Sequence, residues 1–345
     1  MWNANPQAND SRATGGDFCG QISNLRFGQN VLTNNFDPGL LNGWGVRPSD
    51  WSLGFSVQQQ LMARASVEIA YSRRSFNGFV VTDNLVTRSS DYTPYQITAP
   101  LDSRLPGGGG YVVSGLYDVI PTLSGQINNN IADSGQFGNI YQYFNGLDIS
   151  LNVRTAAGLT IQGGTSTGQN VADACDARTN LPELNLGIGG GLTGSTVSST
   201  SPYCHVAYGV LTQLRGLTAY TIPKLDVQLS AVFQSKPGAL LSANYAVPNA
   251  DAAKSLGRNL SGNATQVVVN LIEPGSKYGD RLNQLDFRAG KILKFGKTRT
   301  AVNLDLFNAF NRNTALTVNN NYASWQQPLS ILPARLVKIS VQFDF

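Results

Sequence analysis

Residues 336–345 read Leu-Val-Lys-Ile-Ser-Val-Gln-Phe-Asp-Phe, and this stretch decides the fold. From Val337 to Phe345 every second residue is apolar, and polar residues stand between them. Because successive side chains of a β-strand point to opposite faces, this period of two predicts a strand with one apolar and one polar face. About ten residues is also the length that a tilted strand needs to cross a bilayer. The stretch therefore predicts a membrane-spanning strand.

The composition agrees with a membrane protein built from strands. Charged residues make up 13% of the 345 residues, Gly occurs 36 times, and the mean hydropathy is −0.13. No run approaches about 18 consecutive apolar residues, so transmembrane helices are not expected, whereas barrel strands carry apolar residues only at every second position. The net charge of +4 is small and scattered, and we expect no nucleic-acid partner.

The same alternation recurs along the chain in four predicted hairpins. Their strands cover residues 51–58 with 67–72, 147–153 with 159–164, 214–222 with 225–233, and 285–289 with 302–306. A further short pair is expected around 79–86. Tight turns of about two to six residues alternate with loops of roughly 25 to 70, as in outer-membrane barrels, where short turns are periplasmic and long loops extracellular. The last strand then ends in the periplasm.

We therefore predict an all-β fold, an antiparallel transmembrane β-barrel of which this chain forms a C-terminal segment of about nine or ten strands. Residues 1–50 read as an irregular extracellular-loop region and 51–345 as the barrel part. Bacterial single-chain barrels have even strand numbers, and an open edge in lipid is not tolerated. Residues 1–20 contain no signal peptide. The expectation is that the remaining strands precede Met1 in a longer protein.

Polar residues that alternate with the apolar ones are candidates to line the barrel lumen. They are Asp148, Asn152, Asp226, Gln228, Asp286, Arg288, Asn303 and Asp305, with Lys338 and Gln342 in the last strand. They could bond to water or to a plug, or they could steer a solute. Contacts to a solute are expected rather from the aromatic and Asn-rich loops 92–117 and 319–325, because loops carry recognition.

The cysteines and the single histidine carry no catalytic pattern. Cys175 and Cys204 lie in one polar segment and could pair in an oxidising compartment, or remain two unlinked thiols. His205 cannot by itself support a triad or a zinc site. Gly296-Lys297-Thr298 imitates the end of a phosphate-binding loop, but Lys291 stands where that motif requires Gly. We therefore predict neither an enzyme nor a cofactor.

Several stretches together resemble the C-terminal part of TonB-dependent outer-membrane receptors, in particular the acidobacterial type with an N-terminal carboxypeptidase-regulatory-like domain. They are residues 41–46, 67–74, 105–111, 278–284 and 303–311, and the terminal Phe345. The run Asn-Leu-Asp-Leu-Phe-Asn at 303–308, followed by a terminal Phe, is the most specific of them.

This resemblance implies a 22-stranded barrel closed by an N-terminal plug and energised through a TonB box. Nine strands would then be the fourteenth to the twenty-second. The implied partners are outer-membrane lipid, the barrel-assembly machinery, an unknown solute, and TonB through a plug that is absent from this chain. Val341, Phe343 and Phe345 would form the C-terminal assembly signal. The chain departs from the family in lacking the plug, the TonB box and the signal sequence.

Two other functions fit the same alternation. A general outer-membrane porin would let solutes diffuse through a polar lumen without a plug. A secreted β-sandwich would turn its apolar residues to a core and act as a binding or adhesion module. Strand length, loop asymmetry and aromatic residues near strand ends favour the barrel. The solute is left open among siderophores, cobalamin, oligosaccharides and peptides.

Overall fold

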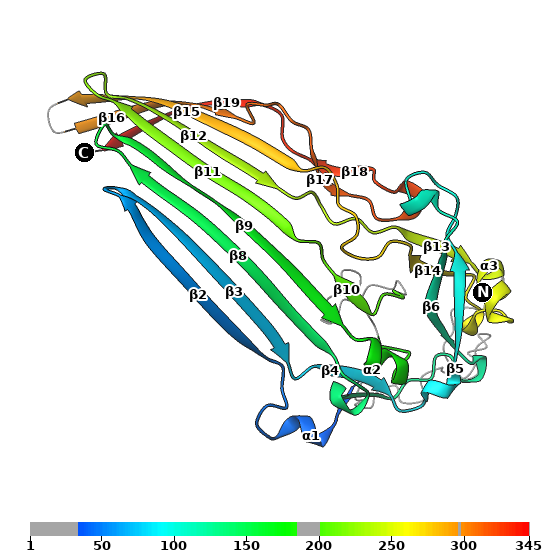
Figure 1. The fold of residues 1–345 in the computed structure, drawn as a ribbon. Helices are drawn as coiled ribbons and strands as arrows, with labels where there is room; N and C mark the ends of the chain where they lie inside the picture. The colour runs from blue at the N-terminus through cyan, green and yellow to red at the C-terminus, as the bar shows by residue number, and fades with distance from the viewer. Residues whose placement is uncertain (1–33, 185–200, 296–297, 345) are drawn as a thin grey trace, which may run out of the picture.

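One large antiparallel sheet dominates the computed structural model, which describes residues 34–184, 201–295 and 298–344. Its strands lie in the order β19-β16-β15-β12-β11-β9-β8-β3-β2, so each pairs with its neighbours along the chain (Figure 1). The strands are β2 (Ser49–Met62), β3 (Ala65–Asn77), β8 (Tyr141–Arg154), β9 (Leu159–Asp173), β11 (Leu211–Ile222), β12 (Val227–Lys236), β15 (Leu282–Phe295), β16 (Thr298–Phe307) and β19 (Leu336–Asp344). The four predicted hairpins and the terminal strand are all present.

The register gives the sheet one apolar face and one polar face. Ile69 lies opposite Ile149, and Leu304 lies opposite Ile339, on what we call the apolar face. Ala70 lies opposite Asp148, and Asn303 opposite Ser340, on what we call the polar face. Because the side-chain period of a strand is two, this register keeps every alternating apolar residue of the nine strands on the same side.

The long connections gather at one end of the sheet and the short turns at the other (Figure 1). The connections contain β1 (Asn35–Phe36), α1 (Pro38–Leu41), β4 (Val80–Asn84), β5 (Tyr92–Thr98), β6 (Val112–Val119), β7 (Asn129–Asp133), α2 (Cys175–Asn180), β10 (His205–Ala207), β13 (Asn244–Pro248), α3 (Asn249–Leu256), β14 (Gln266–Asn270), β17 (Ala315–Val318) and β18 (Pro328–Ile331). Short 3-10 helices lie at Ser89–Asp91, Pro106–Gly108, Pro121–Leu123, Ser134–Gln136, Ser261–Asn263 and Tyr322–Ser324. None of the helices in the described residues is long and apolar enough to span a bilayer.

The structure corrects the predicted pairing of residues 79–86. β4 does not form a local hairpin there; it pairs antiparallel with β7, with Val81 opposite Ala132, and β7 also pairs in parallel with β1. The predicted strand 159–164 is too short as well, since β9 continues to Asp173 and pairs with β10. Both errors have one cause. A strand beyond the apolar part of the sheet need not alternate, because its hydrogen bonds and its packing into a loop cluster, as for Val81, hold it.

The connections are folded and have hydrophobic cores of their own. The larger one, which we call the loop core, joins three connections that are far apart in sequence. Its buried members are Tyr95, Ile97, Ala99, Leu105, Val113, Leu116, Ala243, Val247, Ala252, Leu256, Leu260, Val269, Leu271, Ile272 and Trp325. In Figure 1, β5, β6, β13, β14 and α3 lie together at this end. The loops are therefore positioned by packing against one another as well as by the strands.

Candidate functional site

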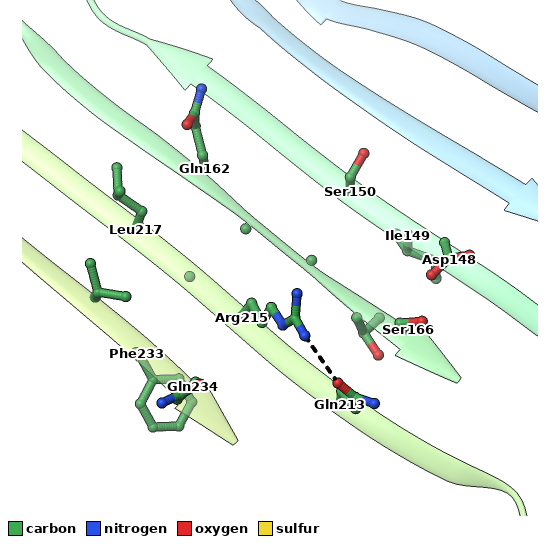
Figure 2. Close-up of a pocket in the computed structure, with 15 residues that line it drawn as sticks. Asp148, Ile149, Ser150, Gln162, Ser166, Gln213, Arg215, Leu217, Phe233 and Gln234 are labelled. Atoms are coloured by element: carbon green, nitrogen blue, oxygen red, sulfur yellow. Dashed lines mark hydrogen bonds between the residues drawn. The ribbon is translucent and has the colours of Figure 1, made fainter. Parts of the chain in front are cut away.

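A hollow in the polar face, which we call the wall cavity, lies over β8, β9 and β11 (Figure 2). Its volume is about 660 Å³. Ser150 and Arg215 both lie opposite Gly164 in the register, one on each side of β9. A Cβ atom at Gly164 would come 2.2 Å from the carbonyl oxygen of Ile149, so the position requires glycine. The missing side chain keeps the hollow open.

The wall cavity is lined by amide and hydroxyl side chains, one carboxylate and one guanidinium group. Its polar lining consists of Asp148, Ser150, Gln162, Thr165, Ser166, Gln213, Arg215 and Gln234. The Arg215 guanidinium donates a long hydrogen bond of 3.4 Å to the Gln213 amide oxygen (Figure 2). Such a surface suits a hydrated, hydrogen-bonding neighbour, because amide and hydroxyl groups can both donate and accept.

Only Asp148 of this set was singled out as a lumen residue from the sequence. Arg215 and Gln213 were missed because Leu217 interrupts the polar positions of β11. Counting every second residue back from Leu217 would have found both.

Three other predicted lumen residues are engaged in internal bonds on the polar face. Arg288 forms an ion pair with Asp305 on the neighbouring strand. Asp286 accepts hydrogen bonds of 3.0 Å from the Gln284 side-chain amide and 2.8 Å from the backbone N–H of Asn308. These bonds tie β15 to β16, so the three residues help to hold the sheet together.

The remaining predicted lumen residues lie at different heights along the polar face. Asn303 packs beside Gly290, where a Cβ atom would come 2.5 Å from its side-chain oxygen, and Gln228 lies opposite the same glycine. Asn152 lines another hollow of about 840 Å³ together with Arg64 and Arg154. Lys338 lies opposite Asp305, and Gln342 opposite Ala301.

Asp226 lies in the turn before β12 and not in the strand, and it accepts a hydrogen bond of 2.9 Å from Lys294 Nζ. Val341 and Phe343 of the predicted assembly signal are exposed on the apolar face. Phe345 lies outside the described residues, and so do Gly296 and Lys297 of the rejected phosphate-loop imitation.

The two loops expected to contact a solute meet each other. Tyr322 donates a hydrogen bond of 2.9 Å to the Asp102 carboxylate, and the Arg104 guanidinium lies 5.5 Å from the Trp325 ring centroid. Trp325 is only 2% exposed, and Tyr95 is buried in the same loop core. These aromatic side chains were expected to offer a binding surface, but they serve as packing that fixes the loops.

A second cavity, which we call the mouth cavity, lies where the sheet meets β4 and β7. Its volume is about 830 Å³. The strand ends contribute Asp50 and Phe76, which lie opposite each other in the register of β2 and β3. Glu183, which follows α2, forms part of the opposite wall. Nothing in the alternation pattern pointed to this cavity, because most of its lining comes from the long connections.

A disulfide fixes the segment that carries Glu183. Cys175 and Cys204 are bonded, with their Cα atoms 4.8 Å apart. Next to the bond, His205 Nδ1 lies 2.7 Å from Asp173 Oδ2, and the backbone N–H of Cys175 donates to the same carboxylate at 2.9 Å. Within residues 34–184, 201–295 and 298–344, no three His, Cys, Asp or Glu residues are grouped closely enough to hold a metal ion.

No family model matches the chain, and no curated protein matches it. Among solved structures the chain is similar to the outer membrane transporter YddB from Escherichia coli, with a TM-score of 0.45 and 10% sequence identity. The match covers 90% of this chain and 34% of that one. This chain thus spans about a third of the length of that transporter.

Proposed function

We propose that this chain forms part of the wall of a transmembrane β-barrel in the bacterial outer membrane. The apolar face carries the proposal. Large apolar side chains remain exposed on it from one edge of the sheet to the other, including Phe55 at 67% and Ile339 at 73%. A soluble sandwich buries such a face against a second sheet, and exposed apolar patches of this extent mark a membrane or protein contact.

Strand length and connection length support the same environment. The strands of the large sheet run from 9 residues in β19 to 15 in β9, whereas strands of soluble sheets commonly have about five or six. A transmembrane strand needs about 9 to 11 residues. Short turns at one end and long folded connections at the other fit periplasmic turns and extracellular loops.

The two edges of the sheet, β2 and β19, support a barrel completed by other strands. Nine strands alternate in direction along the sheet, so β2 and β19 run the same way. Pairing β2 directly with β19 would give a parallel contact, which outer-membrane barrels of this kind do not use. Unpaired strand edges are not tolerated in lipid. We therefore infer that an odd number of further strands lies between the two edges.

The finer proposal is energised import of a large or scarce solute by a TonB-dependent receptor of 22 strands, of which these would be the last nine. The sequence runs that resemble that family support it. Asn303–Phe307 forms the second half of β16, and Asn308 directly after it is buried. TonB would act through a plug segment that is not among these 345 residues, and the barrel-assembly machinery would insert the strands.

Two measurements on the protein as the bacterium makes it test this proposal. We expect it in the outer-membrane fraction, soluble only in detergent, and with a gel mobility that changes on heating. We also expect it to bind the purified periplasmic domain of TonB. A folded, monodisperse monomer without detergent would overturn the membrane assignment. Steady ion conductance in planar bilayers, without TonB binding, would instead favour a porin.

A further inference from the structure

The mouth cavity has apolar walls that could hold a hydrocarbon or aromatic group. They are formed by Phe76, Phe79, Val81, Tyr92, Ile131 and Leu184. These residues come from the ends of the large sheet, from β4, β5 and β7, and from the segment after α2. A volume of about 830 Å³ lies within the range of small-molecule sites, about 300–1,000 Å³.

The charged groups of the lining have one sign. Among the described residues, Asp50 and Glu183 line the cavity and no Lys or Arg side chain does. Asp50 is compensated, because it accepts a hydrogen bond of 2.8 Å from Arg74 Nε. No Lys or Arg of the described residues forms an ion pair with Glu183. Its carboxylate accepts a long hydrogen bond of 3.4 Å from the backbone N–H of Asn84 and is also hydrogen-bonded by its own backbone N–H and by the Thr87 side chain. Glu183 is thus the lining carboxylate that no ion pair within the described residues neutralises, although its charge and that of Arg178 interact.

Arg178 is the cationic residue near Glu183 in the sequence, and its guanidinium group makes other contacts. Arg178 on α2 is buried, donates from Nη1 to the Leu184 carbonyl oxygen at 2.8 Å, and lies 5.4 Å from the Tyr117 ring centroid. Burial raises the pKa of Glu183, and the neighbouring Asp83 carboxylate adds to the shift. Hydrogen bonds from the backbone N–H groups of Glu183 and Asn84 and from the Thr87 side chain work against it. A carboxylate in this setting gains most from a cation supplied by a ligand.

We propose that the mouth cavity binds an organic cation, an amine with an aromatic or aliphatic body, and that Glu183 pairs with its ammonium group. The apolar walls take the body, and the amide side chains of Asn77, Asn129 and Gln142 border the cavity. The disulfide at Cys175 holds the start of the segment that presents Glu183. If the proposed transport holds, the cavity would be a first capture site at the extracellular mouth.

The test compares three fluorinated probes on the purified protein in detergent by fluorine NMR titration. They are a phenethylamine, the phenethyl alcohol of the same shape, and a phenylpropionate. We expect the amine to bind at least about tenfold more tightly than the alcohol, since a hydrogen bond to a charged group contributes about 1.5–3 kcal/mol. We expect the carboxylate to bind most weakly. Equal binding of amine and alcohol, or tighter binding of the carboxylate, would overturn the proposal.

Two variants with matched controls make the test specific. Glu183→Gln should reduce the preference for the amine to about threefold or less, whereas Glu273→Gln on an exposed loop should not change it. Thr82→Trp should fill the cavity from an exposed lining position and abolish binding of all three probes. Thr317→Trp, on an exposed position of β17, controls for the added indole. Unchanged binding in both cavity variants would place the probes elsewhere, for example in the micelle.

This experiment measures binding alone, so its outcome is separate from that of the membrane assignment. Loss of amine selectivity in a detergent-soluble, TonB-binding protein would reject the ligand class and leave the proposed function standing. Amine-selective binding by a protein that is soluble without detergent would support the ligand class and reject the membrane assignment.

Discussion

Asp102 and Arg104 hold together two loops that are 220 positions apart in the sequence. Asp102 accepts hydrogen bonds from the guanidinium and the backbone N–H of Arg104 and from the Tyr322 hydroxyl. These hydrogen bonds, those from Arg104 above all, and the charge of Arg104 hold the pKa of Asp102 well below its ordinary value. Because the pKa is lowered in the folded state, the ionised carboxylate stabilises the fold at neutral pH.

Replacing Asp102 by Asn should change how stability depends on acid. In the unaltered protein the stabilisation is present above the unfolded pKa of an aspartate, about 3.9, and is lost as the pH falls toward the lower folded value. We expect melting temperatures of the unaltered protein to fall more steeply below about pH 4 than those of Asp102→Asn, which should be less stable at neutral pH. Parallel pH profiles for the two proteins would contradict this role.

Asn308 has a structural role at the end of β16. It is 2% exposed, has a positive φ of 48°, and its side-chain N–H₂ donates to the carbonyl oxygens of Arg312 and Pro333, both at 2.8 Å. Its side-chain oxygen accepts from the Arg312 backbone N–H at 3.0 Å. Short polar side chains tolerate this backbone region better than others. The Asn that ends the family-like run therefore fixes the last long loop.

Asn308→Ala should lower the free energy of unfolding by about 2–4 kcal/mol, since it leaves buried carbonyls unpaired and puts alanine at positive φ. Denaturant unfolding in micelles would measure this loss. Asn313→Ala, five residues on and exposed, is the control and should change stability by less than about 0.5 kcal/mol. Equal effects of the two substitutions would mean that the hydrogen bonds of Asn308 contribute little.

Adjacent residues of β19 lie on opposite faces of the sheet. Ile339 lies on the apolar face opposite Leu304, and Ser340 lies on the polar face opposite Asn303. In a bilayer, arginine on the lipid side near the midplane costs about 2–4 kcal/mol, while a lumen position tolerates it. We expect Ile339→Arg to impair outer-membrane assembly and stability, and Ser340→Arg to do so much less. The reverse order, measured by heat-modifiable gel mobility, would mean that the faces are assigned wrongly.

The strands could be predicted from the sequence and the loops could not, for a physical reason. Residues such as Ile69, Leu304 and Val341 alternate because the large sheet has two different faces, and that pattern is local. The pairing of Val81 with Ala132 depends on backbone hydrogen bonds between distant segments and leaves no period. Trp325 has the character of a recognition residue in an Asn-rich loop, yet it is buried in the loop core, most of whose members, such as Leu116 and Leu271, come from other connections.

Some candidate site residues could likewise be predicted from the alternation, and others could not. Asp148, Arg288 and Asp305 follow from counting alternate positions, although the ion pair between the last two had no sequence signal. Asp226 was placed in a strand because it shares the parity of Gln228, but the turn extends through it. Glu183 could not be found, since its neighbours in the mouth cavity, such as Asp50 and Tyr92, come from elements far away in the chain.

The direction of the two edge strands determines which strands can complete the sheet. β2 and β19 run the same way, so neither direct closure of the sheet nor the meeting of β19 with β2 of a second copy in the same membrane would be antiparallel. Further strands in odd number satisfy both edges, and a 22-stranded barrel would supply thirteen. The requirement for an odd number of further strands follows from the order and direction of the strands alone.

The contacts across the loop core have a consequence for the order of assembly. The Arg104 side chain donates to the carbonyl oxygen of Trp325, which is synthesised 221 residues later. Contacts of such long sequence separation are slow to form, because a long stretch of chain must be ordered first. The loop core is therefore complete only after residue 325 has been synthesised. Until then the cluster that contains Tyr95 and Leu116 lacks one of its buried members, so a chain stalled before residue 325 would leave this hydrophobic core incomplete.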